Sequence, residues 1–359
     1  MQTAADRRRD DRLRAGLEMV APGTVLREGL ERILRAETGA LIVLGDSGPV
    51  DPICSGGFGI DEGITAQRVS ELAKMDGAIV LSDDVERIVR ANVHLVPDPT
   101  IPTEESGTRH RTAERVAKQT GVPVLAVSQS MRMVTIYVDA SRHVLEDVAA
   151  ILGRANQALQ TLERYKQHLD EVSVTLSALE VEDLATLRDA LTVLQRMEMV
   201  RRIADEIEGA VAELGVEGRL VRLQLDELMG GIEAERTLLV RDYVASKRGR
   251  KLDSSLGDLD KLSPEQLLDL GVLASCLNHP VEGLETTISP KGYRILSRIP
   301  RLPAQVIEKI VGTLGRLPKV LTASQDELML VEGVGAARAT LIKDGLTRLA
   351  ESSILERYL

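Results

Sequence analysis

Short apolar runs alternate with stretches of helical apolar spacing over the first 140 residues of the chain. Apolar residues three and four positions apart predict helices over 26–35 and 65–75, and a third helix over 112–120 ends at Gly121 and Pro123. Apolar and β-branched runs predict strands over 40–44, 77–81, 124–127 and 133–138. Alternating strands and helices indicate an α/β domain, with a mixed sheet flanked by helices.

A long helical pattern follows, and no proline occurs between Leu145 and Val244. Apolar residues recur at helical spacing among charged ones, and one such stripe contains Leu187, Leu191, Leu194 and Met197. This pattern predicts a helical bundle that acts as a spacer. The basic run at 246–251 interrupts it, and we interpret this run as an exposed linker, either solvated or in contact with phosphate.

The remaining residues predict two short helix-turn-helix units, with turns at 299–303 and 332–335. The chain is therefore expected to be multidomain, α/β followed by all-α. Its expected domains are an α/β domain over 1–145, a helical linker domain over 146–288 and a C-terminal domain over 289–359.

Composition excludes several classes of protein. The 359 residues include no Trp and one Phe, so binding of single strands by stacking bases on aromatic side chains is disfavoured. Cys54 and Cys276 are far apart and lack the spacing of a zinc site or a disulfide framework. The charged N-terminus and the absence of an apolar run of about 18 residues predict a cytoplasmic protein without a membrane segment.

Charge is distributed unevenly along the chain, whose net charge is −10. From Lys291 to Leu359 there are 11 basic and 7 acidic residues, so the acidic excess lies in the rest of the chain. A basic tail on an acidic body favours nucleic-acid contact at one end.

Two motifs in the α/β segment carry candidate chemistry. Asp76-Gly77-Ala78 stands at the start of a strand, where a carboxylate can hold Mg²⁺ or accept a proton from a hydroxyl, and Gly77 would allow close approach of a ligand. The run 107–112, Gly-Thr-Arg-His-Arg-Thr, precedes a helix. Thr108 or Thr112 could cap that helix, and its basic start is either a triphosphate site or an ordinary surface feature.

Together, Asp76-Gly77-Ala78 and Arg109-His110-Arg111 resemble the two hallmark motifs of the diadenylate cyclases. The likeness runs from Thr24 to Asp139 and includes residues 39–45 and 55–58. The whole chain is similar to the DNA integrity scanning branch of that family, which adds a helical spacer and a helix-hairpin-helix tail.

This resemblance implies a reaction between two ATP molecules held on facing subunits, which yields cyclic di-AMP and two pyrophosphates. It implies that Asp76 orients or deprotonates the 3′-hydroxyl and helps to place Mg²⁺ or Mn²⁺, while Gly77 supplies a backbone contact. Phosphate contacts would come from the basic motif, its flanking threonines and the next strand: Arg109, His110, Arg111, Thr108, Thr112 and Ser128. Ala78 completes the nucleotide-binding set, and the family suggests an octamer.

The second C-terminal turn, Leu330 to Gly335, resembles a helix-hairpin-helix motif, followed by Ala339 and Ile342 on one helix face. Gly333 and Gly335 would let the backbone pass close to DNA, and Arg338 and Lys343 would add contacts to phosphate. The alternative is a tight turn between helices. The family implies binding of branched DNA in response to DNA damage, with inhibition of the cyclase.

The same residues leave other functions open. A DNA-binding scaffold or nucleotide sensor without catalysis is one alternative, and a repair nuclease is another. Ser55 to Gly59 lacks the Lys and Ser/Thr of a P-loop, so we interpret it as a turn. His94 is interpreted as a packed or surface histidine rather than a ligand.

Overall fold

The computed structural model describes residues 4–245 and 252–357, with side chains over 11–245 and 252–351. The predicted basic linker at 246–251 lies outside the described residues. Contacts group the chain into two compact units. The first contains the described residues up to 157 and the segment 206–224, and the second contains 158–205 and the described residues from 225 onward. The proposed three-domain division stays a prediction.

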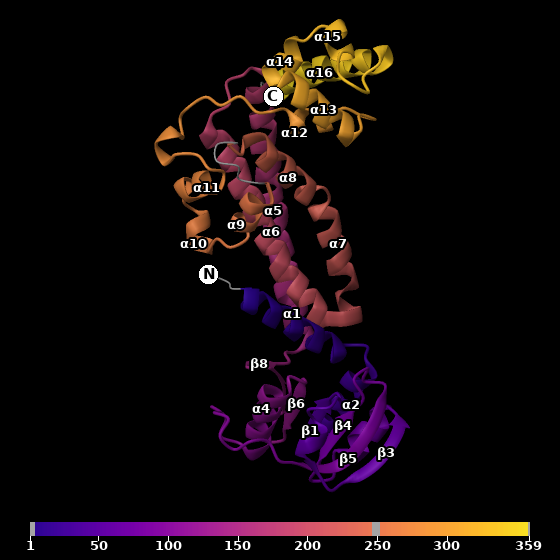
Figure 1. The fold of residues 1–359 in the computed structure, drawn as a ribbon. Helices are drawn as coiled ribbons and strands as arrows, with labels where there is room; N and C mark the ends of the chain where they lie inside the picture. Colours follow the sequence, from indigo (N-terminus) through magenta and orange to yellow (C-terminus); the bar gives the residue numbers. More distant parts are fainter. Residues whose placement is uncertain (1–3, 246–251, 358–359) are drawn as a thin grey trace. The chain divides into compact units, whose positions relative to one another are not determined.

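An eight-stranded mixed sheet forms the centre of the first unit (Figure 1). The strand order is β2-β5-β4-β1-β6-β7-β8, and β3 pairs with β5. β1 and β4 run parallel, whereas the other paired neighbours run antiparallel. The strands are β1 (Ala40–Leu44), β2 (Cys54–Ser55), β3 (Phe58–Gly63), β4 (Ala78–Leu81), β5 (Arg87–Leu95), β6 (Val124–Ser128), β7 (Met133–Val138) and β8 (Ser141–Val144). The predicted mixed sheet is confirmed.

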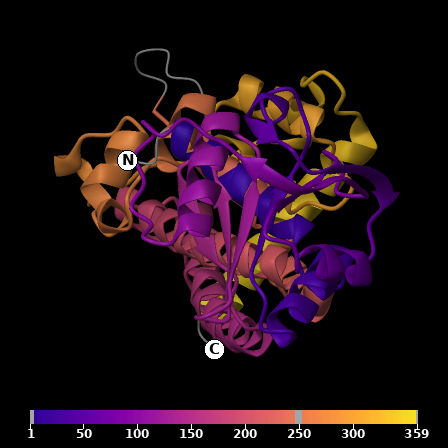
Figure 2. The same cartoon turned by 90° about the horizontal axis from the view of Figure 1, so that it is seen from below.

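Helices cover both faces of this sheet (Figures 1 and 2). One face packs against α1 (Ala4–Met19), α2 (Val25–Arg35) and α3 (Ala66–Leu72), and the other packs against α4 (Thr108–Thr120). Alternation along β1 explains the two cores, because Ile42 lies in one and Val43 in the other.

One edge of the sheet gathers the start of β1, the start of β4 and the end of β6. The parallel register pairs Ile42 with Ile79, and the antiparallel register pairs Ala40 with Val127. Gly39, Gly77 and Ser128, which flank or end these strands, therefore lie at the same edge. Segments far apart in the sequence meet there.

The spacer segment is helical, as predicted. It contains α5 (Val148–Val181), α6 (Leu187–Leu214), η2 (Gly215–Gly218), α7 (Arg219–Met229), α8 (Ile232–Tyr243), α9 (Leu252–Leu259), α10 (Pro264–Leu267), α11 (Leu270–Cys276) and η3 (Val281–Gly283). The predicted stripe is fully buried, with Leu187, Leu191, Leu194 and Met197 at most 2% exposed. Within the described part of the chain, no helix combines the length and apolarity that crossing a membrane requires.

The last helices surround a small core of their own. They are α12 (Tyr293–Ser297), α13 (Ala304–Leu314), α14 (Leu317–Thr322), α15 (Gln325–Met329) and α16 (Ala336–Arg357). Ala339 and Ile342, predicted to share a face of the last helix, are both fully buried in this core. The two predicted turns join α12 to α13 and α15 to α16.

A buried polar network joins α12 to α5 and α8 within the second unit. The Arg294 guanidinium pairs with the Glu180 carboxylate, and these side chains are 1% and 0% exposed. Tyr243 donates a hydrogen bond of 2.8 Å to Glu180. Asp242 accepts backbone N–H bonds from Gly292, Tyr293 and Arg294 at the start of α12. These paired charges fix α12 against the spacer helices.

Candidate functional site

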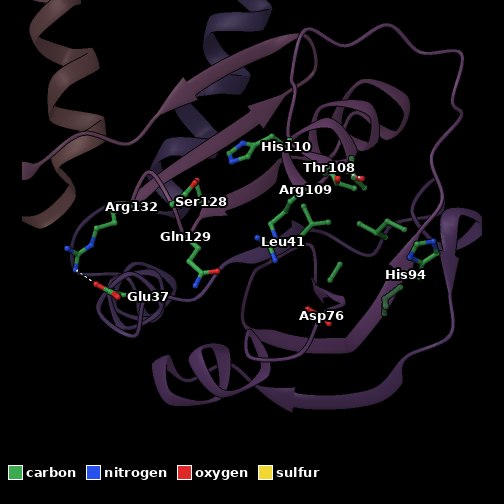
Figure 3. A pocket seen from close by; sticks show the side chains of 16 residues that line it. Glu37, Leu41, Asp76, His94, Thr108, Arg109, His110, Ser128, Gln129 and Arg132 are labelled. Carbon is green, nitrogen blue, oxygen red and sulfur yellow. Dashed lines mark hydrogen bonds and ion pairs between the residues drawn. The ribbon is translucent and has the colours of Figure 1, made fainter.

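A cavity of about 960 Å³ lies at the sheet edge described above (Figure 3). Its lining includes Asp76, Ala78, Thr108, Arg109, Thr112 and Ser128. The structure thus brings together most of the nucleotide-site residues that were predicted from two separate motifs. A volume of this size suits a nucleotide.

Helix α4 begins at Thr108, four residues earlier than the sequence predicts, so the basic motif forms its first turn. The predicted threonine cap is wrong, because the N-cap residue is Gly107 and no side chain caps the helix. The Thr112 hydroxyl instead donates to the Thr108 carbonyl. With no acidic residue in the first turn, the free N–H groups and the helix dipole favour an anion at this end.

Arg109 supplies a cation at the same place. Its side chain is half-buried, and it has no hydrogen-bond or ion-pair partner among the residues that the structure describes. Gly39, just before β1, provides the space for it: a Cβ atom there would lie 2.1 Å from Arg109 Nη1. Gly39 is therefore a residue of the site that motif reasoning missed, because its role depends on a contact across 70 positions of sequence.

Replacing Gly39 with alanine is expected to push the Arg109 guanidinium out of its place. The displaced atoms are the end of a flexible side chain, so the free energy of unfolding should change little. Affinity for the expected nucleotide, ATP, should fall about 10-fold, because the charge-assisted hydrogen bonds from Arg109 are weakened. Calorimetric titration with 3′-deoxy-ATP measures this without turnover. Gly59→Ala, which adds a Cβ where no atom lies within 4 Å, is the matched control; equal affinities for the two variants would contradict the assignment.

Asp76 and Gly77 occupy the turn before β4. Asp76 is exposed and lines the cavity, and it has no hydrogen-bond or ion-pair partner among the described residues. Gly77 does not line the cavity. A Cβ atom on it would lie 2.2 Å from the backbone carbon of Asn92, at a register shift between β4 and β5. The space that a Cβ atom on Gly77 would need is therefore occupied by the backbone of β5, and not left open for a ligand.

His110 is 9% exposed and belongs to a chain of hydrogen bonds. Its Nδ1 atom lies 2.9 Å from the Tyr137 hydroxyl, which donates to Glu105 at 2.7 Å. Arg142 pairs with the same carboxylate at 2.8 Å. Burial lowers the pKa of His110; Glu105 opposes this shift, while Arg142 and Arg109 add to it. The imidazole is therefore held neutral near pH 7.

Several other residues complete the description. Ser128 is buried at the end of β6, and its hydroxyl accepts from the Met131 N–H. Arg111 does not line the cavity, and its guanidinium faces the carbonyl oxygens of Glu105 and Ser106 at 3.4 Å. Its phosphate contact stays a prediction. His94 is exposed at the cavity rather than packed.

Sequence reasoning also missed the loop after β6. Gln129, Ser130 and Arg132 line the cavity, and Arg132 pairs with Glu37 at 3.2 Å (Figure 3). The only signal in the sequence was their place directly after a predicted strand. That signal is weak, because polar residues follow most strands.

The cavity offers few ligands to a metal. No group of three His, Cys, Asp or Glu side chains that could hold an ion occurs within residues the structure describes. Because Glu37 is paired with Arg132, Asp76 is the carboxylate available in the lining. One carboxylate together with substrate phosphates is a common way to bind Mg²⁺, so the donor set fits an ion that arrives with a nucleotide.

The second C-terminal turn contains a glycine in the left-handed region of backbone conformation. Gly333 adopts φ +89°, which favours glycine, and α16 starts at Ala336. Arg338 is exposed, and its Nη1 donates to the Gly333 carbonyl at 2.6 Å. The Lys343 ammonium instead donates to the carbonyls of Leu321 and Ala323. Its DNA contact, like that of Gly335, stays a prediction.

Comparisons with known proteins identify the family of the chain. A profile described as "DisA bacterial checkpoint controller nucleotide-binding" matches residues 27–142, and one described as "DisA bacterial checkpoint controller linker region" matches 145–284. The protein named DNA integrity scanning protein DisA from Acidothermus cellulolyticus is 62% identical over 99% of this chain and 97% of its own length. The protein of the same name from Streptomyces coelicolor is 59% identical over 97% of this chain and 95% of its own.

Proposed function

We infer that this chain, which belongs to the DisA family of DNA integrity scanning proteins and has a diadenylate cyclase domain, condenses two ATP molecules into cyclic di-AMP in the cytoplasm. One observation supports this proposal above others. The uncapped start of α4 lines one cavity together with Arg109 and Asp76, neither of which has a partner within the part of the chain that the structure describes. Anion-binding groups and a carboxylate therefore lie around the same space.

The proposed reaction needs no covalent intermediate on the protein. The 3′-oxygen of one ATP forms a bond to the α-phosphorus of a second ATP, the bond to pyrophosphate breaks, and the hydroxyl proton leaves. The reciprocal attack closes the ring and releases the second pyrophosphate. Positioning and neutralisation of charge supply most of the acceleration in such transfers.

Each residue has a part that follows from its place. The N–H groups of the first turn of α4, with Arg109 and Thr108, hold the triphosphate. Asp76 orients the 3′-hydroxyl and accepts its proton. Ser128, Thr112 and Ala78 contact the nucleotide from the cavity wall.

A divalent cation, Mg²⁺ or Mn²⁺, would be held by Asp76 together with the phosphates, and when bound it supplies neutralisation of phosphate charge. Asp76 is thus proposed both to contact the cation and to orient the hydroxyl. Assays with each ion in turn will show which of the two supports the reaction.

We propose that each cavity holds one nucleotide, and because the reaction joins two nucleotides, two subunits must face one another. An octamer, built of such pairs, is the proposed assembly. A mass measurement that finds only monomer under conditions of full activity would contradict this mechanism.

The reaction is tested with the full-length protein, ATP and either Mg²⁺ or Mn²⁺. Mass spectrometry should detect cyclic di-AMP, and two pyrophosphates should appear for each molecule of it. If the protein binds ATP but forms no product with either ion, the cyclase proposal fails. The alternative, a catalytically silent nucleotide-sensing DNA-binding scaffold, would then take its place.

We further propose that the α15–α16 turn is a helix-hairpin-helix that binds branched DNA without reading its sequence, and that bound DNA inhibits the cyclase. The supporting features are the Gly333 backbone and the exposed Arg338. Contacts of this kind are to phosphate, so affinity falls with salt. Junction DNA that binds yet leaves the output of cyclic di-AMP unchanged would remove the regulatory part of the proposal.

Replacing Arg338 with glutamine is expected to weaken binding of all junction sequences alike. The slope of log affinity against log salt should become shallower by about 0.9, the loss of one phosphate contact. Fluorescence anisotropy over a range of salt concentrations measures this slope. Arg338→Lys keeps the charge and Arg348→Gln removes an exposed charge ten residues along α16, so both should keep the slope of the native protein. Nicking of the DNA in the same samples would support the alternative that the protein is a repair nuclease.

A further inference from the structure

The hydrogen-bond pattern around His110 is set by residues outside both motifs. Glu105 lies in the loop before α4, Tyr137 in β7 and Arg142 in β8. Tyr137 is 1% exposed, with its hydroxyl between the Glu105 carboxylate and the His110 ring. These side chains come from three different segments and do not line the cavity themselves, whereas His110 does.

The donors and acceptors in this series of hydrogen bonds can be assigned in one consistent way. The Glu105 carboxylate is paired with the Arg142 guanidinium, and a carboxylate in an ion pair accepts hydrogen bonds but does not donate them. The Tyr137 hydroxyl therefore donates to Glu105, and its oxygen is left to accept from His110. Hence Nδ1 carries the proton of the neutral imidazole, and Nε2 carries a lone pair.

The Nε2 atom is buried and has no partner among the described residues, although the ring lines the cavity. A buried acceptor without a donor is uncommon in folded proteins and calls for an explanation. An unprotonated Nε2 cannot donate to a phosphate oxygen, which differs from the role expected from the motif. It can accept a hydrogen bond from a hydroxyl group of the bound nucleotide, or coordinate a cation bound with that nucleotide.

We propose that Tyr137 and Glu105 are positioning residues of the cyclase, which hold His110 as the Nδ1–H tautomer so that Nε2 presents a lone pair to the nucleotide site. The part that concerns catalysis rests on the proposed function. Partners of this kind orient a histidine and select its tautomer, and their loss typically lowers affinity or activity 10- to 100-fold.

The charged groups around the imidazole agree with a neutral ring. Arg109 on α4 and Arg142 on β8 disfavour a second proton, whereas Glu105 favours one. Burial is the largest cause of the lowered pKa of His110, and among the neighbouring charges Glu105 opposes it more than either arginine adds to it.

The tautomer is measured directly by magic-angle-spinning ¹⁵N NMR of full-length, histidine-labelled protein. The chain has five histidines, and a His110→Gln sample identifies the signal. We expect a protonated Nδ1 and a bare Nε2 at pH 7. In Tyr137→Phe the Nδ1 proton loses its acceptor, so the signal should shift toward the Nε2–H tautomer. Glu105→Gln should shift it partway, because an amide can also donate to the tyrosine.

Kinetics give the second measurement. Tyr137→Phe should lower kcat about 10- to 100-fold while KM for ATP changes less than threefold. Tyr243→Phe is the matched control, since it also removes a buried hydroxyl that donates to a glutamate, but in the other compact unit. Its kcat should equal that of the native protein.

The outcomes separate this proposal from the cyclase itself. An Nε2–H tautomer in an active native protein overturns the proposal and leaves the cyclase in place. A tautomer change in Tyr137→Phe with unchanged kcat also overturns the positioning role. The expected tautomers in a protein that makes no cyclic di-AMP would support the hydrogen-bond relay while the proposed function fails.

Discussion

Replacing Asp76 with asparagine is expected to lower the rate of cyclic di-AMP formation by about 10³-fold, within the usual range for the loss of a general base. The amide keeps the size of the side chain but cannot take the hydroxyl proton or bind a cation strongly. Asp76 is exposed, so the fold should be unaffected. Initial rates of product formation, measured at saturating ATP, give the effect on kcat.

Glu71→Gln is the control for Asp76→Asn. Glu71 is exposed in α3, pairs with Lys74 and does not line the cavity. Glu71→Gln removes the same charge five residues away from Asp76, so the rate of this variant should stay within twofold of the native rate. If Asp76→Asn retained more than a tenth of the native rate, Asp76 would not be the base, and proton removal by solvent would have to be considered instead.

Replacing Glu180 with alanine is expected to destabilise the second unit by about 3–5 kcal/mol, the usual cost of breaking a buried ion pair. The Arg294 guanidinium, 1% exposed, would lose its buried carboxylate partner and keep only the half-buried Glu235, at 3.5 Å. Tyr243 would lose its acceptor as well. Urea unfolding followed by circular dichroism measures the change in free energy.

Glu163→Ala, an exposed position on the same helix, should change the free energy of unfolding by less than about 0.5 kcal/mol. Double replacement of Glu180 and Arg294 by apolar residues should recover part of the loss, because no unpaired charge then stays buried. A loss below 1 kcal/mol in Glu180→Ala would mean that the buried ion pair contributes little to holding α12 in place.

Part of the fold was predictable from local pattern. The strands 40–44 and 133–138 have the predicted bounds, since each is a short run of apolar or β-branched residues buried on both faces. Strands β3 and β5 were missed because Gly, Asp, Glu and Arg interrupt their apolar pattern, and much of β3 is exposed. Pairing with each other and with β4, rather than local sequence, makes these two segments strands.

The candidate site divides in the same way. Asp76 and Arg109 were found from motifs, and Ser128 from its place at the end of the next strand. The structure gathers them because the starts of β1 and β4, the end of β6 and the start of α4 share one edge. Gly39, Glu105 and Tyr137 carry no local signal. Their importance arises from contacts with residues 109 and 110, which are distant from Gly39 and Tyr137 in sequence.

By itself, the sequence determined the family, the mixed α/β and helical composition, and the residue types that chemistry on ATP requires, because apolar periodicity and short motifs are local properties. Tertiary structure alone decided which of those residues share a cavity, that Arg111 and Lys343 are held by carbonyl oxygens, and that His110 faces a tyrosine–glutamate pair. These facts depend on distances between segments far apart in the chain, and such distances are set by strand order and packing rather than by any local pattern.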